Sequence, residues 1–365
     1  MAPPPPELIE DVTAEILLPL PPDEPEHLVR ALLVCKPWLR LISDPGFLRR
    51  YRAFHGTPPL LGLLYRLRVI SGKNNPRLAP TTAVPLFPYT NLWWSDVLDC
   101  RHGRVLLLVM ERDWYFVVWD PVTGEQQRLP DIGIPWLIYT AVVICAVSCC
   151  DHLDCHGGPF RVFLLSSTTK HDKRIKASVY SSESGAWRVT VCLSESCLPP
   201  RSTVIQPRRV ALIGDDIYFT RPEDNAIIKY ELSKNCLSMI NPPSPNVSDS
   251  YTTLMVMEDG SLGFACLKSF SLYLWSRKVN SKRAAKWIQC RVIELDGMVP
   301  IANPDDRALV VDFAEGVGAI FVRTCVGLFM IKLSSGRVRM VGGPGFYFCV
   351  IPYMSFYTPG CGTLS

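Results

Sequence analysis

One short segment of the chain concentrates the side chains that bind metal ions most readily. It reads Cys149-Cys150-Asp151-His152-Leu153-Asp154-Cys155-His156, and cysteine thiolates and histidine imidazoles are the usual ligands of structural zinc. Structural zinc sites usually take ligand pairs from the two sides of a loop, whereas these residues fall within one turn before Gly157-Gly158-Pro159. The spacing therefore favours a loop between strands, and we predict neither a metal nor another cofactor. A zinc site in this segment would use Cys150, His152, Cys155 and His156.

Sequence motifs of enzymes are absent from the chain. It contains no G-x-S-x-G elbow, no phosphate-binding G-x-x-x-x-G-K and no H-E-x-x-H helix. It has only six His, and none of them stands in a recognisable nucleophile–base arrangement. We therefore predict a non-catalytic protein. An enzyme that assembles its site from distant loops would show no such motif, so it stays an alternative.

The overall composition is that of a globular protein with little preference for charged partners. The net charge is +4 and charged residues make up 20% of the chain, spread over many short segments, so we expect no nucleic-acid partner. The longest apolar run, 136–147, is shorter than the roughly 20 residues that cross a bilayer, so we expect no membrane partner. The N-terminus shows no secretory signal, and the 14 Cys lie mostly in apolar runs, as free buried thiols do. These features predict a cytoplasmic or nuclear protein.

Residues 7–54 are predicted to form three short helices. Acidic residues precede the apolar run that ends at Leu20, and prolines follow it, which is typical of a first helix. Asp23 and Glu26 have the spacing of a capping box for a second helix. Pro37 opens a third helix, which Asp44-Pro45-Gly46 ends.

Such short helices cannot bury their apolar faces by themselves. Isolated helices of fewer than about 12 residues are marginal, and a domain of this size leaves much apolar surface exposed. A partner protein is the expected recipient of that surface. The alternative is that the helices only cap a larger domain of the same chain.

The same segment resembles an F-box. The resemblance rests on Leu8-Ile9-Glu10-Asp11, Ala14-Glu15-Ile16-Leu17-Leu18, Leu20-Pro21-Pro22, Leu33-Val34-Cys35-Lys36-Pro37-Trp38 and Leu41-Ile42-Ser43-Asp44-Pro45-Gly46-Phe47, in that order. The family usually has proline where Ile9 stands, and an arginine or similar residue where Pro19 stands. The resemblance implies docking onto a Skp-type adaptor and, through it, a cullin–RING ubiquitin ligase. The residues that it implies as adaptor contacts or their support are Leu8, Ile16, Leu20, Pro21, Leu28, Val34, Cys35, Trp38 and Leu41.

The remainder of the chain is predicted to be all-β. After a segment 55–98, which serves as a linker and could hold first strands, pairs of apolar runs recur every 45 to 60 residues and close on an aromatic or aliphatic residue. That period is typical of a β-propeller, here of about six blades over 99–358, and a large β-sandwich is the competing fold. A sixth blade could join 60–67 to 347–353 and so close the ring. The five pairs are 104–108 with 116–121, 160–165 with 177–180, 216–219 with 227–232, 262–266 with 272–275, and 319–322 with 328–331.

This later region also resembles the F-box-associated, Kelch-like region of plant, particularly grass, F-box proteins. The resembling pieces are 118–124, 150–160 and 352–357. Together the two resemblances imply the substrate-recognition subunit of an SCF-type ubiquitin ligase, with a propeller that recruits a target protein of unknown identity. The alternatives are a propeller enzyme and a scaffold that delivers nothing for ubiquitination.

Overall fold

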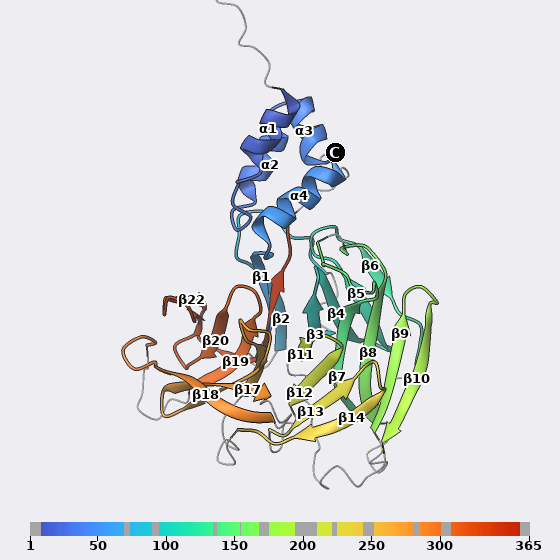
Figure 1. Ribbon diagram of the computed structural model, residues 1–365, viewed down its shortest axis with the longest axis vertical. Helices are drawn as coiled ribbons and strands as arrows, with labels where there is room; N and C mark the ends of the chain where they lie inside the picture. Colours follow the sequence, from blue (N-terminus) through green and yellow to red (C-terminus); the bar gives the residue numbers. More distant parts are fainter. Residues whose placement is uncertain are drawn as a thin grey trace, which may run out of the picture.

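The chain begins with helices and continues with strands (Figure 1). The computed structural model describes residues 9–68, 74–89, 95–133, 137–153, 155–167, 175–193, 210–220, 225–243, 252–279, 285–300 and 308–357. The helices are α1 (Glu10–Leu17), α2 (Glu26–Leu32), α3 (Lys36–Ile42) and α4 (Pro45–His55). The strands are β1 (Leu60–Arg68), β2 (Asn74–Pro80), β3 (Ser95–Arg101), β4 (Arg104–Met110), β5 (Trp114–Trp119), β6 (Gln126–Arg128), β7 (Leu137–Cys145), β8 (Phe160–Ser167), β9 (Ile175–Ser181), β10 (Ala186–Leu193), β11 (Ala211–Ile213), β12 (Asp216–Thr220), β13 (Ile227–Glu231), β14 (Cys236–Ile240), β15 (Thr252–Val256), β16 (Leu262–Lys268), β17 (Ser271–Val279), β18 (Ala285–Glu294), β19 (Leu309–Ala314), β20 (Ala319–Arg323), β21 (Leu328–Lys332), β22 (Val338–Gly342) and β23 (Phe346–Met354).

The N-terminal module has a fourth helix where three were predicted. Asp44 accepts a hydrogen bond from the backbone N–H of Phe47 at 3.0 Å, and Pro45 occupies the first turn of α4. A capping aspartate followed by proline is a strong helix start. The segment at Asp44 therefore ends α3, as predicted, and also begins α4.

The predicted capping box of the second helix is wrong. α2 follows Pro25, and no side chain caps it. Glu26 lies in its first turn, where a negative charge still complements the helix dipole.

The four helices share a small apolar core. Buried side chains from all four helices and the α1–α2 connection meet in it, and the partly buried Trp38 packs against it. Tyr51 of α4 is central to this core, and its hydroxyl donates a hydrogen bond to the Leu20 carbonyl at 2.8 Å. The buried members are Ala14, Leu17, Leu18, Leu28, Ala31, Leu32, Leu41, Ile42, Phe47 and Tyr51.

The strands form a six-bladed β-propeller, which confirms the predicted architecture. Five four-stranded antiparallel sheets take their strands in chain order, β3–β6, β7–β10, β11–β14, β15–β18 and β19–β22. The sixth sheet has the order β2-β1-β23, so it joins the first strands of the chain to the last one. The predicted pairing of 60–67 with 347–353 is therefore confirmed, and it closes the ring. β1 and β2 lie inside the segment 55–98.

The helical module stands at one end of the propeller, with α4 nearest to it (Figure 1). Two arginines of α4 contact the loop between β7 and β8. Arg49 pairs with Asp151 at 2.5 Å, and Arg52 donates a hydrogen bond to the Leu153 carbonyl at 3.0 Å. Phe356, just after β23, packs against the helical core near Tyr51. The module is thus held by two separate parts of the propeller chain.

Among the described residues, no helix is long and apolar enough to cross a membrane.

Candidate functional site

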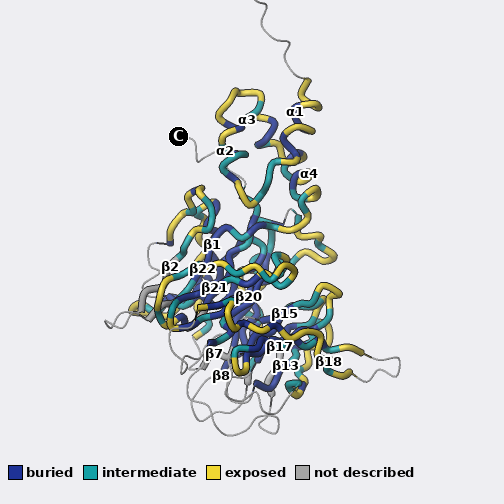
Figure 2. The backbone as a smooth tube through the Cα atoms, turned by 90° about the vertical axis from the view of Figure 1, so that its left-hand side faces the viewer, coloured by how far each residue is buried: buried dark blue, intermediate teal, exposed yellow. Residues whose placement is uncertain are grey.

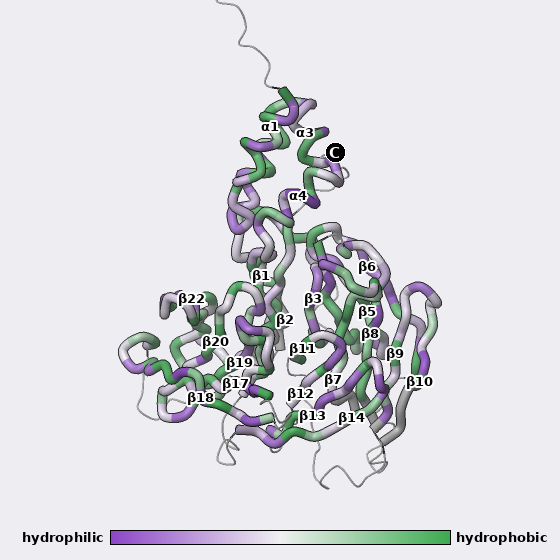
Figure 3. Tube along the Cα trace, viewed as in Figure 1, coloured by the Kyte–Doolittle hydropathy of each residue, from purple (hydrophilic) through white to green (hydrophobic). Residues whose placement is uncertain are grey.

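The helical module carries apolar side chains that its own core does not use. On α1, Ile16 is 53% exposed, and Val12 and Ile9 lie four and seven residues before it on the same face. In the turn between α2 and α3, Leu33 and Val34 are 66% and 62% exposed. The exposed turn and outer helix surfaces are visible in Figure 2, and their apolar stretches in Figure 3. Exposed apolar groups of this density on a small module are typical of a protein-binding surface.

The residues predicted to contact an adaptor divide by burial. Ile16, Val34 and Cys35 are exposed and available for direct contact. Leu28 and Leu41 are buried in the helical core, so they can only support the surface from beneath. The partly buried residues are Leu20, Pro21 and Trp38, and Leu8 lies outside the described residues.

A second feature is a cavity of about 330 Å³ where the helical module meets the propeller. It is lined by the α4–β1 connection, by the loops after β3 and β7, and by the residues around β23. His102, His152 and Cys155 lie in its wall, so it is the place where an enzyme built on this fold would find acid–base groups.

Two ionisable groups of this cavity have pKa values far from neutral pH. Burial, followed by the positive charges of His152 and neighbouring arginines, lowers the pKa of His102 to about 3. Burial, together with the neighbouring thiols of Cys145 and Cys150, raises the pKa of Cys155 to about 12. A general base works best with a pKa near the working pH, and a nucleophilic cysteine needs a lowered one. The pKa of His102 is too low for a general base at neutral pH, and that of Cys155 is too high for a nucleophile.

A buried cation at the cavity wall connects three blades. Arg101, at the end of β3, pairs with Glu315 after β19 at 3.1 Å and lies 3.4 Å from the Asp99 carboxylate. Its guanidinium also donates a hydrogen bond to the carbonyl of Val210, just before β11. Asp99 in turn accepts a hydrogen bond from the backbone N–H of Val143 on β7 at 3.0 Å. This network ties β3 to three other inner strands or their ends.

The turn after β5 is built around Asp120. One carboxylate oxygen accepts hydrogen bonds from the backbone N–H groups of Val122 and Thr123 at 2.8 and 3.3 Å, and the other lies 2.9 Å from His156 Nε2. Burial disfavours the charged carboxylate, but the hydrogen bond and charge of His156, with the two backbone N–H groups, hold the pKa of Asp120 below its usual value. The turn is thereby tied to the β7–β8 loop.

We expect Asp120→Ala to lower the free energy of unfolding by about 2 to 3 kcal/mol and Asp120→Asn by about 1 kcal/mol. Asparagine keeps the turn's acceptor and loses only the charge. Because the folded-state pKa of Asp120 is lowered, the stability from its charge is present above its unfolded pKa and is lost as the pH falls through the folded pKa. Urea unfolding at pH 7 and at about pH 3 checks this. The prediction would be contradicted if the difference in the free energy of unfolding between wild type and Asp120→Asn were the same at both pH values.

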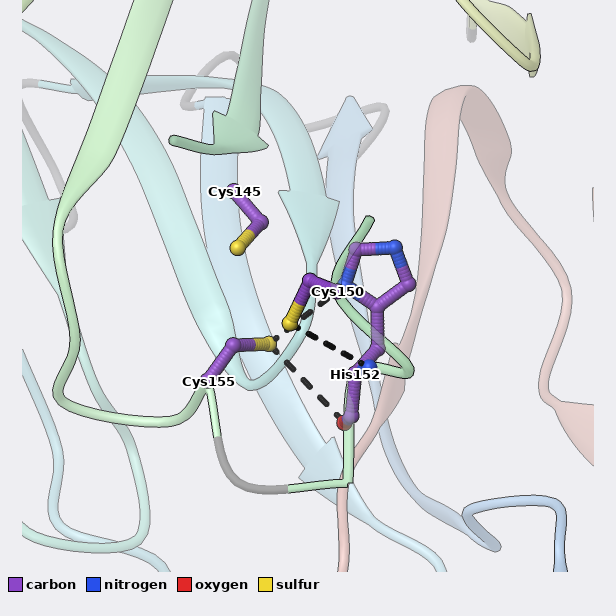
Figure 4. A group of neighbouring side chains, drawn as sticks. All are labelled: Cys145, Cys150, His152 and Cys155. Carbon is purple, nitrogen blue, oxygen red and sulfur yellow. Dashed lines mark hydrogen bonds between the residues drawn. The ribbon is translucent and has the colours of Figure 1, made fainter. Parts of the chain in front are cut away.

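Only some side chains of the Cys/His segment 149–156 lie close together in the structure. Cys150, His152 and Cys155 converge, and the residue that joins them is Cys145 at the end of β7 (Figure 4). His156 lies instead against Asp120. Cys145 is half-buried and ends β7.

A comparison with models of protein families agrees with the propeller. Residues 96–359 match the model of a family described as F-box protein AT5G49610-like, beta-propeller. The F-box protein At5g03970 of Arabidopsis thaliana is 26% identical over 370 residues, covering 91% of this chain and 82% of that protein. A chain in the crystal structure of a nidogen/laminin complex is 11% identical with a TM-score of 0.42, covering 82% of this chain and 99% of its own length. A putative 6-phosphogluconolactonase from Bacteroides uniformis is 13% identical with a TM-score of 0.37, covering 80% and 98%.

Proposed function

This chain belongs to the family of AT5G49610-like F-box protein β-propellers, and from that premise we propose that it is the substrate-recognition subunit of an SCF-type cullin–RING ubiquitin ligase. The N-terminal helices act as the F-box that docks a Skp-type adaptor. The propeller, of Kelch-like type, recruits the target protein. The ligase works in the cytoplasm, the nucleus or both.

The observation that carries the proposal is the exposed apolar surface of the helical module. Ile16, Leu33 and Val34 are more than half exposed, although the module has a core that other apolar residues fill. Burial of such side chains in an interface contributes about 25 cal/mol per Å² of apolar area before the costs of association. An adaptor would supply the cover that the described part of the chain does not.

The propeller suits the role of a receptor because its hydrogen-bonded sheets can position the loops that connect them. Recognition residues are commonly carried on such loops. A receptor of this kind performs no bond chemistry itself. It raises the effective concentration of target lysines near a charged ubiquitin carrier.

The main alternative, a propeller enzyme, would use the cavity below α4. The pKa shifts of His102 and Cys155 argue against acid–base or nucleophilic catalysis there. A second alternative is a scaffold that binds the adaptor without delivering a target.

Reconstitution with purified components tests the proposal. We expect the full chain to co-purify with a Skp-type adaptor and cullin in a complex of equal stoichiometry, and a chain lacking residues 1–54 to lose it. Affinity purification from cells under proteasome inhibition should then recover a target whose level rises when the receptor is removed. Absence of adaptor binding would contradict the receptor and the scaffold alike, while binding without any stabilised partner would favour the scaffold.

A further inference from the structure

The loop between β7 and β8 folds back so that three cysteines and one histidine face one another. Cys145 ends β7, and Cys150, His152 and Cys155 follow within the loop (Figure 4). One ligand atom from each of the four residues lies within 4.8 Å of all the others. Cys155 Sγ and His152 Nδ1 lie 3.6 Å apart. The three sulfurs are free thiols.

These separations are close to those of a tetrahedral metal site. With Zn–S bonds of about 2.3 Å and Zn–N bonds of about 2.0 Å, neighbouring ligand atoms lie about 3.5 to 3.8 Å apart. The pair at 3.6 Å already has that separation, and the 4.8 Å limit requires the widest pair to approach by roughly 1 Å. Soft thiolates with one imidazole in a tetrahedral arrangement favour zinc over calcium or magnesium.

We propose that Cys145, Cys150, His152 and Cys155 bind one Zn²⁺ in a closed, structural Cys₃His site. All four positions are taken by side chains, so the ion has no open position for a substrate. Binding releases the three thiol protons to solvent, and the resulting site carries one net negative charge.

The surroundings of the cluster fit that charge and fix its ligands. The guanidinium of Arg104 is buried beside it and donates hydrogen bonds to the carbonyls of Cys155 and Gly158 at 2.7 and 2.5 Å. The ring of His152 stacks on that of His102, with centroids 4.0 Å apart, which fixes the plane of the ligand. These two contacts hold the backbone of Cys155 and the ring of His152 in place.

The metal site would also stabilise the contact between α4 and the propeller. Asp151 and Leu153, which Arg49 and Arg52 of α4 contact, lie between the ligands Cys150 and Cys155. Metal binding would hold this short stretch in the one conformation that α4 recognises. The ion therefore acts as a structural clamp beneath the helical module.

Metal analysis of the purified full chain tests the proposal, with Zn²⁺ and Co²⁺ as the probes. We expect about one tightly held zinc per chain, and on Co²⁺ replacement the intense visible absorption of a tetrahedral site with thiolate charge-transfer bands. Cys150→Ser and His152→Ala should each lower the zinc content by about tenfold after dialysis against a chelator, because loss of one ligand opens the site.

Two matched controls come from the same loop. Cys149→Ser alters the thiol next to Cys150, and His156→Asn alters the imidazole that contacts Asp120; both should keep the zinc and the Co²⁺ spectrum. A disulfide among Cys145, Cys150 and Cys155 in mass spectrometry, no zinc retention by the wild type, or equal loss of zinc in the controls would each overturn the proposal. Zinc content does not depend on adaptor binding, so this result stands apart from that of the proposed function.

A second measurement reports on the clamp without altering the chain. Chelation should increase amide hydrogen exchange in 146–159 and in α4 by about tenfold or more, with blades β11–β14 and β15–β18 unchanged. Exchange that stays the same throughout, in a chain from which zinc has been removed, would contradict the link to α4.

Discussion

A charged substitution in the α2–α3 turn, Val34→Glu, is expected to weaken binding of a Skp-type adaptor by at least about 30-fold. Val34 is 62% exposed, so the glutamate stays in water while the chain is free, and the melting temperature should not change. In a complex that covers this turn, the charge must be buried without a partner, at about 2 kcal/mol or more. Calorimetry or surface plasmon resonance of the full chain measures the loss.

The chain offers matched controls for this experiment. Val189→Glu makes the same change at a valine that is 66% exposed on β10 of the propeller, and adaptor binding should be unaffected. Leu28→Ala, by contrast, empties a position that is 2% exposed and should destabilise the helices by about 2 to 5 kcal/mol. If Val34→Glu binds as well as Val189→Glu does, the turn is not part of the docking surface.

The sequence could predict the middle of each blade better than its borders. The recurring pairs correspond to the second and third strands of the five chain-ordered sheets, such as β4 with β5 and β20 with β21, whose residues are mostly buried. The outermost strands, β6 and β18 among them, are largely exposed and therefore carry little apolar signal. Strands are predicted from the periodicity of apolar residues, and that periodicity reflects such burial patterns.

Two of the innermost strands, β3 and β19, were missed for another reason. The pairing of β3 with β4 shifts between Val97 and Asp99, and that of β19 with β20 shifts between Val310 and Asp312. A bulge interrupts the alternation of apolar residues and turns a buried carboxylate toward the neighbouring backbone. Buried aspartates of this kind look like turn residues in the sequence.

In the helical module, a local signal was available for the missed helix. Asp44-Pro45 has the residue types of a helix start, although it was interpreted only as a helix end. Burial of the individual apolar residues was not available from the sequence. Leu28 and Val34 are both apolar members of the same motif, yet one is buried and the other exposed.

The metal-ligand cluster could be recognised only in part. Three of its members stand in one turn, whereas Cys145 lies five residues before Cys150 and ends a strand. Only the folding back of the loop over the end of β7 brings the fourth ligand to the others. His156 has the right chemistry and the right distance in sequence, but the contact with Asp120 holds it elsewhere.

Among single substitutions in the propeller, Arg101→Met is expected to be one of the most destabilising, lowering the free energy of unfolding by about 3 to 5 kcal/mol. Arg101 is buried, and it contacts the Glu315 carboxylate and lies near that of Asp99. Methionine fills much of the space but removes the positive charge between two acidic groups, one of which is itself buried. Urea unfolding followed by tryptophan fluorescence gives the midpoint and the slope that are needed.

A matched substitution of an exposed arginine distinguishes the loss of the Arg101 contacts from the mere loss of a long side chain. Arg128 stacks over the ring of Tyr115 at 3.9 Å on the outer strand β6, and Arg128→Met should cost no more than about 1 kcal/mol. Arg101→Lys keeps the charge, but its compact ammonium cannot reach all three partners as the planar guanidinium does, so its loss should fall between the two. Because the double variant Arg101→Met with Glu315→Gln removes both charges of one pair, its loss should be smaller than the sum of the single losses. Additive losses, or a loss below about 1 kcal/mol for Arg101→Met, would show that the three blades are held together by apolar packing alone.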